Sequence, residues 1–128
     1  MTVSYVLDAS FVLAFLLPSE HNSHVDTIFE QYTRQKIALK SNFLLPFEVI
    51  NGLRSAVIRK RLPIKTAASL VRAFIDLSIT LIETNELATF RFAIKNKLSF
   101  YDASYVYLAK SEKLRLLTFD KELLAVAH

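Results

Sequence analysis

Short apolar segments rich in β-branched residues alternate along this chain with longer segments of helical periodicity. Residues 3–7, 36–40, 79–82 and 114–118 have the length and composition of buried strands. Between them, apolar residues recur at the spacing of amphipathic helices. Strands separated by helices are joined by right-handed crossovers, which place helices on both faces of a parallel sheet. We therefore expect an α/β fold, a three-layer sandwich in which helices flank a short central parallel sheet of about four strands.

The ends of the helices are predicted from capping residues and from the apolar period. Capping places helix starts after Ser19, Thr84, Ser99 and Asp120. Two further helices are expected at residues 43–60 and 64–77, the first with a core-facing stripe of Phe47, Ile50, Leu53, Val57 and Ile58. The rings of Phe11, Phe15, Phe43 and Phe47 are assigned to the core, with a groove for a partner helix as the alternative for some of them.

Composition excludes several classes of protein. The chain has 128 residues, of which 52% are hydrophobic and only one is Gly, and this excludes a disordered or turn-rich β protein. No apolar run reaches the roughly 20 residues of a membrane span, and the N-terminus lacks the pattern of a signal peptide. With no Cys there is no disulfide framework and no thiolate metal site. We expect one domain over residues 1–128, in a cytoplasmic protein without a membrane partner.

Four acidic residues are placed by this pattern near one edge of the sheet. Asp8 ends the first strand and Asp120 follows the fourth, while Asp102 lies in the first turn of the helix after Ser99. Helices that follow parallel strands begin at the carboxyl edge of the sheet, where open α/β folds bind their ligands. Glu48, on a small polar helix face, reaches the same edge if its helix begins there. We therefore expect four carboxylates from distant parts of the chain to converge.

Each of these acids also has a purely structural explanation. Asp120 is a good N-cap, and Asp102, at the third position after Ser99, resembles the acid of a capping box. Glu48 is most simply a solvated helix residue, and Asp8 a turn residue at the end of a strand. Capping does not explain why Asp8 and Asp120 both end apolar strands, so the combination favours a shared site.

Carboxylates gathered in one place call for a cation. Two of them about 5 Å apart repel by roughly 3 kcal/mol at an effective dielectric constant of about 20, so they must protonate, separate or bind metal. All-oxygen ligation without Cys or a well-placed His favours Mg²⁺ or Mn²⁺. Such ions activate water and stabilise the charge that develops on a phosphodiester. Because 16 Lys and Arg face 12 Asp and Glu, a metal-loaded acidic pocket would lie in a cationic surface suited to a polyanion.

The motifs around these acids resemble those of PIN-domain ribonucleases of the VapC toxin kind, over essentially the whole chain. They are Leu-Asp-Ala-Ser at 7–10, Phe-Glu-Val-Ile-Asn at 47–51, Ser-Phe-Tyr-Asp-Ala at 99–103 and Leu-Thr-Phe-Asp at 117–120. The last two motifs, in this order and at this separation, carry most of the specificity. The resemblance implies a PIN-like fold and a divalent-metal-dependent endoribonuclease.

This resemblance assigns roles residue by residue. Asp8, Glu48, Asp102 and Asp120 become the catalytic and metal-binding carboxylates, and Ser10 and Thr118 become supporting groups that orient carboxylates or metal-bound water. Ordinary capping and turn bonding explain Ser10 and Thr118 equally well. The family further implies the toxin component of a type II toxin–antitoxin pair, inhibition by a VapB-like antitoxin, and a homodimer.

Several other features leave alternatives open. Arg54, Arg59, Lys60 and Arg61 are candidates for RNA contacts, although cations near a helix C-terminus are also expected from the helix dipole. His21 and His24 are spaced three apart on a predicted helix, and solvated positions explain them because no third ligand accompanies them. Tyr101, Tyr105 and Tyr107 are assigned to the core and to interfaces, with base stacking as the alternative.

The turn before the last predicted strand departs from the family pattern, and a second function is compatible with the same fold. The family pattern would have Gly in the turn before the last strand, where this chain has Ser111, Glu112 and Lys113, so the turn geometry is open. The rival function is a PIN-like module that binds RNA or a protein without cleaving it. Intact acids at all four positions count against that module.

Overall fold

A parallel four-stranded sheet forms the centre of the computed structural model, which describes residues 2–128. The strands are β1 (Val3–Leu7), β2 (Ile37–Asn42), β3 (Thr80–Ile82) and β4 (Arg115–Leu117). Their order across the sheet is β3-β2-β1-β4, so β1 and β2 are the inner strands. The register pairs Val3 with Ile37 and Leu7 with Leu117, which brings the carboxyl ends of all strands to one edge.

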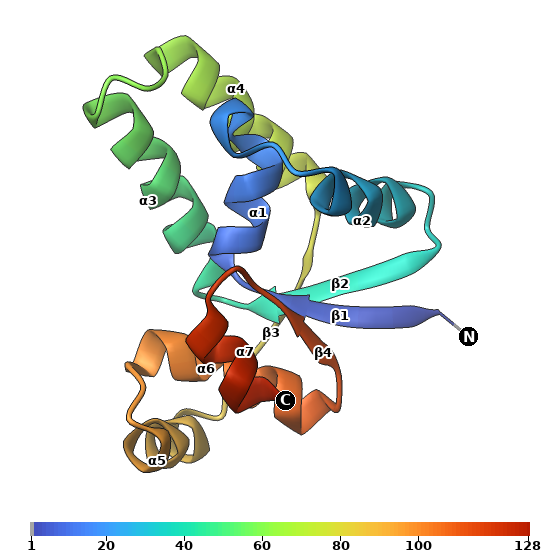
Figure 1. Ribbon diagram of the computed structural model, residues 1–128, viewed down its shortest axis with the longest axis vertical. Coiled ribbons are helices and arrows are strands. Elements are labelled where there is room, and N and C mark those ends of the chain that lie inside the picture. The colour runs from blue at the N-terminus through green and yellow to red at the C-terminus, as the bar shows by residue number, and fades with distance from the viewer. Residues whose placement is uncertain (1) are drawn as a thin grey trace.

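Helices cover both faces of this sheet, as the alternating sequence pattern predicts. One side holds α1 (Ala9–Leu16), α2 (Ser23–Thr33), α3 (Leu45–Ile58) and α4 (Ile64–Leu77), with a 3₁₀ turn at Pro18–Glu20 between α1 and α2 (Figure 1). The other side holds α5 (Glu86–Asn96), α6 (Phe100–Glu112) and α7 (Lys121–Ala127). The predicted three-layer α/β sandwich is confirmed. The assignment of residues 1–128 to one domain stays a prediction.

The core fills the space between the sheet and these two layers. Val6 and Leu7 of β1 are fully buried, as expected for an inner strand covered on both faces. Phe11 and Phe15 of α1 stack on Phe29 of α2, with ring centroids 6.0 and 4.1 Å apart, which confirms the core assignment of Phe11. Within residues 2–128, no helix has the length and hydropathy needed to cross a bilayer.

Two predicted helix starts are wrong, one by three residues and one by a single residue. Helix α2 begins at Ser23 and is capped by Asn22, because Pro18, Ser19 and Glu20 form the 3₁₀ turn instead. Helix α5 is capped by Asn85, the residue after Thr84. In both cases the Asn side chain accepts a hydrogen bond from a backbone N–H of the first turn. Asn is as good an N-cap residue as Ser and a better one than Thr.

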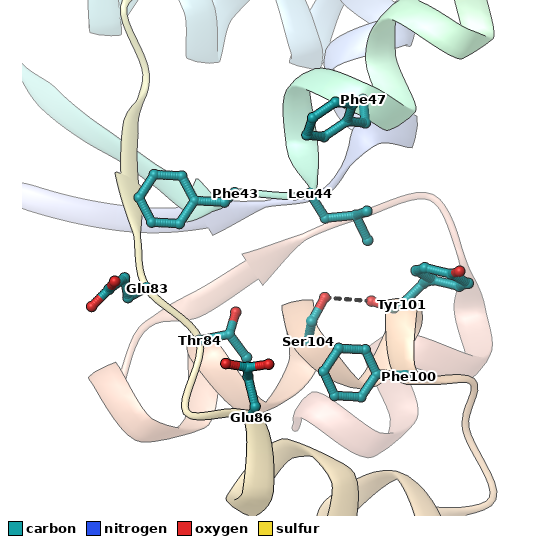
Figure 2. Close-up of a pocket in the computed structure, with 9 residues that line it drawn as sticks. All are labelled: Phe43, Leu44, Phe47, Glu83, Thr84, Glu86, Phe100, Tyr101 and Ser104. Carbon is teal, nitrogen blue, oxygen red and sulfur yellow. Dashed lines mark hydrogen bonds between the residues drawn. The ribbon is translucent and has the colours of Figure 1, made fainter.

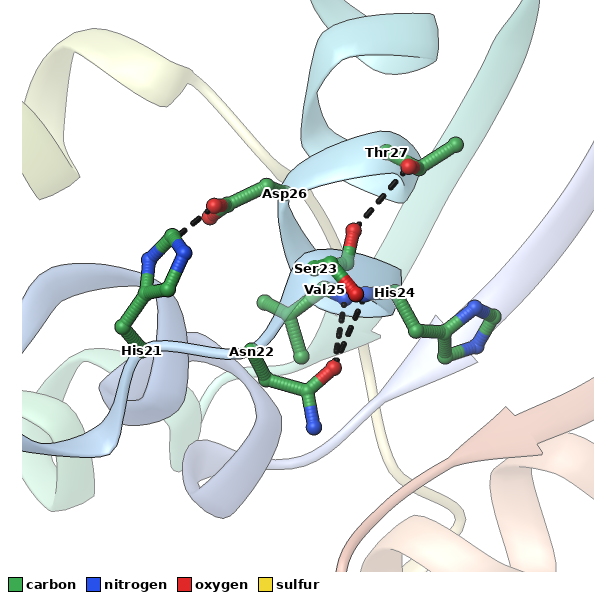
Figure 3. A network of polar contacts seen from close by, with 7 residues as sticks. All are labelled: His21, Asn22, Ser23, His24, Val25, Asp26 and Thr27. Carbon is green, nitrogen blue, oxygen red and sulfur yellow. Dashed lines mark hydrogen bonds and ion pairs between the residues drawn. The ribbon is translucent and has the colours of Figure 1, made fainter.

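The two histidines near α2 do not share a face. His21 precedes the helix, and its Nδ1 lies 3.1 Å from Oδ2 of Asp26, while the His24 ring meets the edge of Phe11. Figure 3 shows the two imidazoles on opposite sides of the first turn of α2. The predicted common face is therefore wrong, because His21 lies outside the helix.

The core-facing stripe predicted for α3 is wrong in part. Phe47 is 75% exposed, Ile50 39% and Ile58 63%, and Phe43 just before the helix is exposed as well. The face that packs inwards consists of Leu45, Val49, Leu53 and Ala56. This helix is apolar on more than one face, so periodicity alone does not decide which face the core takes.

The single glycine of the chain explains how closely α3 approaches its neighbour α1. A Cβ atom added to Gly52 would lie 2.5 Å from Cδ1 of Leu13. Without a side chain at this position, the Leu13 side chain of α1 packs directly against the backbone of α3. Gly52 thus provides the space for this contact between the two helices.

The turn before β4 keeps a left-handed backbone although it lacks the expected glycine. Lys113 has φ 58° and ψ 41° at the C-terminus of α6, and its N–H donates to the carbonyl oxygen of Lys110 at 3.1 Å. Gln35, Lys60, Ser78 and Lys97 adopt the same positive φ after other helices. The chain therefore builds a glycine-type helix end from a residue with a side chain.

We predict that Lys113→Gly stabilises the protein. Glycine removes the steric cost of the left-handed region, and after its larger entropy in the unfolded chain the net gain is about 0.5–1 kcal/mol. Lys110→Gly, in the last turn of the same helix with ordinary helical geometry, is the matched control and costs about 1 kcal/mol. Urea unfolding of the three proteins measures both effects, and a destabilised Lys113→Gly protein contradicts the account of this turn.

Candidate active site

The candidate active site lies where the strand order reverses. The chain runs outwards from β1 through β2 to β3 and then returns to place β4 on the other side of β1. Connections leave β1 and β4 in different directions, and this leaves a crevice at the carboxyl edge between them. Asp8 follows β1 and Thr118 follows β4, so both residues lie at that point.

Asp8 is held at the crevice by a network of polar contacts from two parts of the chain. Its Oδ1 accepts hydrogen bonds from Oγ of Ser10 at 2.6 Å and from the N–H of Phe11 at 3.1 Å. Its Oδ2 accepts a hydrogen bond from Oγ1 of Thr118, 110 residues further along. Oγ of Ser10 also accepts from the N–H of Phe119 at 3.1 Å. Ser10 and Thr118 therefore fix the orientation of this carboxylate.

Burial makes the charge on Asp8 costly. The residue is only 5% exposed, and burial raises the pKa of its carboxyl group above the ordinary value of 3.8. The hydrogen bonds from Ser10, Thr118 and Phe11 act in the opposite direction and lower the pKa, but burial outweighs them. A nearby cation would favour the ionised form and offset this cost.

Asp102 and Asp120 approach the crevice from the starts of α6 and α7. Asp120 caps α7, with Oδ1 accepting from the N–H groups of Glu122 and Leu123 at 2.9 and 3.2 Å. Ser99 caps α6 by accepting from the N–H of Asp102 at 3.0 Å. The pKa of Asp102 is raised, first by burial and then by the negative charge of Asp120. Capping and mutual repulsion between carboxylates are thus both present.

Glu48 joins this group through Tyr105. The Tyr105 hydroxyl donates a hydrogen bond to Oε1 of Glu48 at 2.5 Å, which joins α6 to α3. Burial raises the pKa of Tyr105 above its ordinary value of 10, and the hydrogen bond to Glu48 and the negative charges of Glu48, Asp8 and Asp102 raise it further. The buried hydroxyl of Tyr105 therefore lies within the electric field of three of the four acids at once.

Sequence reasoning missed the part that Tyr105 plays. The core assignment of its ring is correct, since the residue is 2% exposed. The missed signal was its spacing: Tyr105 lies three residues after Asp102 in α6, and residues three apart on a helix share a face. An acid and a tyrosine on one face of a helix that starts at the carboxyl edge indicate a hydroxyl beside the site.

Two buried polar residues at the end of β2 were also missed. Ser41 donates from Oγ to the carbonyl oxygen of Leu7 at 2.7 Å, next to Asp8. Nδ2 of Asn42 donates to Oγ of Ser104 in α6 at 2.7 Å, and its Oδ1 accepts from the N–H of Leu44 at 2.9 Å. Asn42 thereby fixes both α6 and the turn into α3 relative to the sheet. Polar residues at the end of an otherwise apolar strand were the available signal.

The donor set fits a hydrated magnesium-type ion. In the part of the chain that the structure describes, no three Asp, Glu or His side chains are grouped closely enough to form a direct metal cage. Mg²⁺ keeps several waters and is bound through one or two carboxylates, in contrast to the all-protein cages of other metals. The buried carboxylate of Asp8 and the mutually repelling Asp102 and Asp120 offer oxygen donors only, which matches that requirement.

Three of the four predicted RNA-binding cations lie away from these acids. Arg54, Arg59, Lys60 and Arg61 are all exposed. From Glu48 to Arg59 is eleven residues of helix, about 16 Å along the axis of α3, whereas Arg54 is only about 9 Å along it. Figure 1 shows the turn from α3 to α4 on the side of the molecule away from β4 and α7. The cluster of Arg59, Lys60 and Arg61 is therefore outside the acidic group around Tyr105.

Comparison with known proteins supplies the family. The PIN domain family matches residues 5–128, nearly the whole chain. The chain belongs to the PIN-domain family. Over 126 residues it is 32% identical to exonuclease VapC9 of Pyrobaculum aerophilum, and the match covers 98% of this chain and 86% of that protein.

Two solved structures share this PIN fold. PAE2754 from Pyrobaculum aerophilum has a TM-score of 0.76 and 31% identity, over 98% of this chain and 87% of that one. VapC20 of Mycobacterium tuberculosis, a toxin that cleaves the sarcin–ricin loop, has a TM-score of 0.65 and 12% identity over 94% and 93%. The second likeness shows the fold alone. The resemblance to VapC-type PIN-domain nucleases is confirmed, and divalent metal ions are general in PIN nucleases.

We predict that Asp8→Asn stabilises this PIN domain near neutral pH. The amide oxygen still accepts from the N–H of Phe11, and the amide nitrogen can donate to Oγ1 of Thr118, so the buried charge is removed without loss of both contacts. An increase of about 0.5–2 kcal/mol in the free energy of unfolding is expected. Asp76→Asn on the exposed side of α4 is the matched control and leaves stability within about 0.5 kcal/mol.

The pH dependence of that gain has a definite sign. A carboxyl group whose pKa is raised in the folded state adds stability below its unfolded pKa, and this contribution is lost as the pH rises through the folded value. The difference between Asp8→Asn and the unchanged protein should therefore shrink as the pH falls towards 3.8. Chemical unfolding of both proteins between about pH 3.5 and pH 7.5, the range over which carboxyl groups with ordinary or raised pKa titrate, measures this difference in unfolding free energy. A difference that grows in acid contradicts the assignment.

A double-mutant cycle tests the contact between Tyr105 and Glu48. A hydrogen bond to a charged acceptor contributes about 1.5–3 kcal/mol, so Tyr105→Phe and Glu48→Ala should be coupled by roughly that amount. Urea unfolding of both single variants and the double variant gives the coupling energy. Additive effects would mean that Glu48 is a solvated helix residue and not part of the acidic group.

Proposed function

We propose that this chain is a divalent-metal-dependent endoribonuclease and the toxin component of a type II toxin–antitoxin pair. Its active-site residues are Asp8, Glu48, Asp102 and Asp120, with Ser10 and Thr118 as positioning residues. The substrate is RNA, the ion is Mg²⁺ or Mn²⁺, and a VapB-like antitoxin inhibits the enzyme in the cytoplasm. The active form is a homodimer.

The observation that carries this proposal is the position of the buried Tyr105, which donates a hydrogen bond to Glu48 at 2.5 Å and lies one helical turn after Asp102 in α6. The charges of Glu48, Asp8 and Asp102 raise the pKa of this hydroxyl, and the charge of Asp120 raises the pKa of Asp102. Acids placed only for helix capping would have no reason to act on a common buried group. The relative named exonuclease VapC9 and the fold shared with the toxin VapC20 support a nuclease of this kind.

The residues of this chain have distinct tasks in the proposed reaction. Ser10 and Thr118 hold both oxygens of the Asp8 carboxylate, so this group loses little entropy when it meets a ligand. Tyr105 holds one oxygen of Glu48 and leaves the other free to accept a proton or a ligand. Asp8, Glu48, Asp102 and Asp120 would hold a divalent ion, which when bound would supply activated water and stabilise the charge on the phosphodiester.

The most direct experiment separates an endonuclease from an exonuclease. A circular single-stranded RNA has no ends, so only an endonuclease converts it to linear products. We expect cleavage of the circle with Mg²⁺ or Mn²⁺, none with chelator, and a loss of about a hundredfold or more for Asp8→Asn and Asp102→Asn. Asp76→Asn, an exposed acid on α4, should keep full activity.

Each part of the proposal has its own contrary result. Degradation of linear RNA with an intact circle would make the enzyme an exonuclease. Metal-dependent cleavage that survives Asp8→Asn and Asp102→Asn would remove the assigned roles. Binding of RNA without cleavage under every metal condition would favour the silent RNA-binding module, and binding of a protein partner alone would favour the protein-binding one.

A further inference from the structure

A second cleft opens at the carboxyl edge of the sheet, beside the ends of β2 and β3. It has a volume of about 490 Å³, within the usual size of a small-ligand site, and is lined mainly by the exposed rings of Phe43, Phe47, Phe100 and Tyr101. We call it the aromatic cleft. Asp8 and Asp120 lie at the ends of β1 and β4, whereas this cleft lies beside the ends of β2 and β3.

The rings of the aromatic cleft come from two opposing walls. Phe43 and Phe47 belong to the turn after β2 and the start of α3, and Phe100 and Tyr101 belong to the first turn of α6 (Figure 2). Asn42 joins these walls at their base through its hydrogen bonds to Ser104 and Leu44. The two walls are therefore held at a fixed separation before any ligand arrives.

The cleft is continuous in sequence with the candidate active site. Phe47 precedes Glu48 directly, and Tyr101 precedes Asp102 directly. On a helix, adjacent side chains point in directions about 100° apart, so each of these two helix starts presents a ring to the cleft and an acid to the neighbouring side. An RNA strand crossing the acidic group would bring the base of a neighbouring nucleotide to this cleft.

The polar groups of the cleft favour a base over the sugar–phosphate backbone. Glu86 and Thr84 from the β3–α5 connection lie beside Phe100, and Glu83 lies at the outer rim (Figure 2). Carboxylates repel phosphate, and they accept hydrogen bonds from the N–H groups of base edges. Guanine presents two adjacent N–H donors that match the two oxygens of one carboxylate, whereas uracil flanks its one N–H with two carbonyl oxygens.

We propose that the aromatic cleft is a nucleobase-binding subsite that takes the base next to the cleaved bond and prefers guanine. This inference rests on the proposed ribonuclease function. Phe43, Phe47 and the rings of α6 stack on the base, as aromatic residues do in proteins that bind single-stranded RNA. The Glu86 carboxylate accepts hydrogen bonds from the two adjacent N–H donors of guanine.

The test uses two fluorescent octaribonucleotides, one of uracil alone and one with a single internal guanine. Binding is measured in chelator, so that affinity is recorded without turnover. The unchanged protein should bind the guanine-containing strand about tenfold more tightly, the usual discrimination of a two-point contact to a base. Equal affinity for the two strands overturns the guanine preference.

Substitution of the rings tests the stacking. Phe43→Ala and Phe47→Ala should each weaken binding of both strands by about tenfold, as expected for the loss of one stacked base. Phe47→Tyr keeps a ring and should bind as the unchanged protein does. Phe90→Ala is the matched control, because Phe90 is 55% exposed on α5 outside the cleft and Phe43 is 53% exposed within it. Equal effects at Phe90 and Phe47 would overturn a specific stacking site.

Two charge-neutralising variants test the reading of the base edge. Glu86→Gln should abolish the guanine preference, whereas Glu83→Gln, with the same change in charge at the outer rim, should keep it. If both variants alter the preference equally, the effect is general electrostatics and the assignment of Glu86 is wrong. Thermal unfolding followed by circular dichroism identifies any variant that fails to fold. Such a variant is replaced by one with leucine at the same position.

The outcomes separate this inference from the proposed function. If RNA is cleaved but Phe43→Ala and Phe47→Ala leave affinity unchanged, the nuclease proposal stands and the subsite falls. If these variants weaken binding while no metal gives cleavage, the subsite stands and the nuclease proposal falls. Sedimentation of each variant shows whether an affinity loss follows loss of a dimer, in which case the cleft is an interface between copies and the inference is overturned.

Discussion

The carboxylate of Asp8 accepts hydrogen bonds from the hydroxyls of Ser10 and Thr118 and so links β1 to β4. These are the neighbouring strands between which the strand order of the sheet reverses. One hydroxyl comes from α1 and the other from the end of β4, so the contact closes the sheet edge between residues far apart in sequence. It also places a charge where burial opposes it. The fold thus carries at its centre an acid whose ionised form is costly without a cation, which is the usual sign of a functional site.

The other acids are placed by the same topology. Helices that directly follow a strand start at the carboxyl edge: Glu48 lies in the first turn of α3 after β2, and Asp120 caps α7 after β4. Asp102 arrives by a different route, because α6 follows α5 and is held to the sheet edge by the Asn42–Ser104 contact and to α3 by the Tyr105–Glu48 contact. Asp120 serves both the helix and the acidic group, since its Oδ1 caps α7 while its charge raises the pKa of Asp102.

The sequence was sufficient for the layers, the strand positions and the placement of the acids along the edge. Alternation of apolar strands and amphipathic helices has few solutions, and acids directly after strands can lie only at one edge. It was insufficient for α3, whose apolar residues occupy two faces, so Phe47 and Ile50 were assigned to the core although they face outwards. Local spacing could have placed Asn42 and Tyr105 near the site, but not their partners, which lie 62 and 57 residues away in sequence.

The central claim is that the four carboxylates form one site for a divalent ion, and a crystal soaked in Mn²⁺ tests it most directly. Anomalous scattering locates manganese without reference to the protein coordinates. The account predicts a peak at the carboxyl edge beside Asp8, between the ends of β1 and β4, and no such peak in crystals of Asp8→Asn. A strong peak elsewhere on the molecule, or an unchanged peak in the variant, would contradict it.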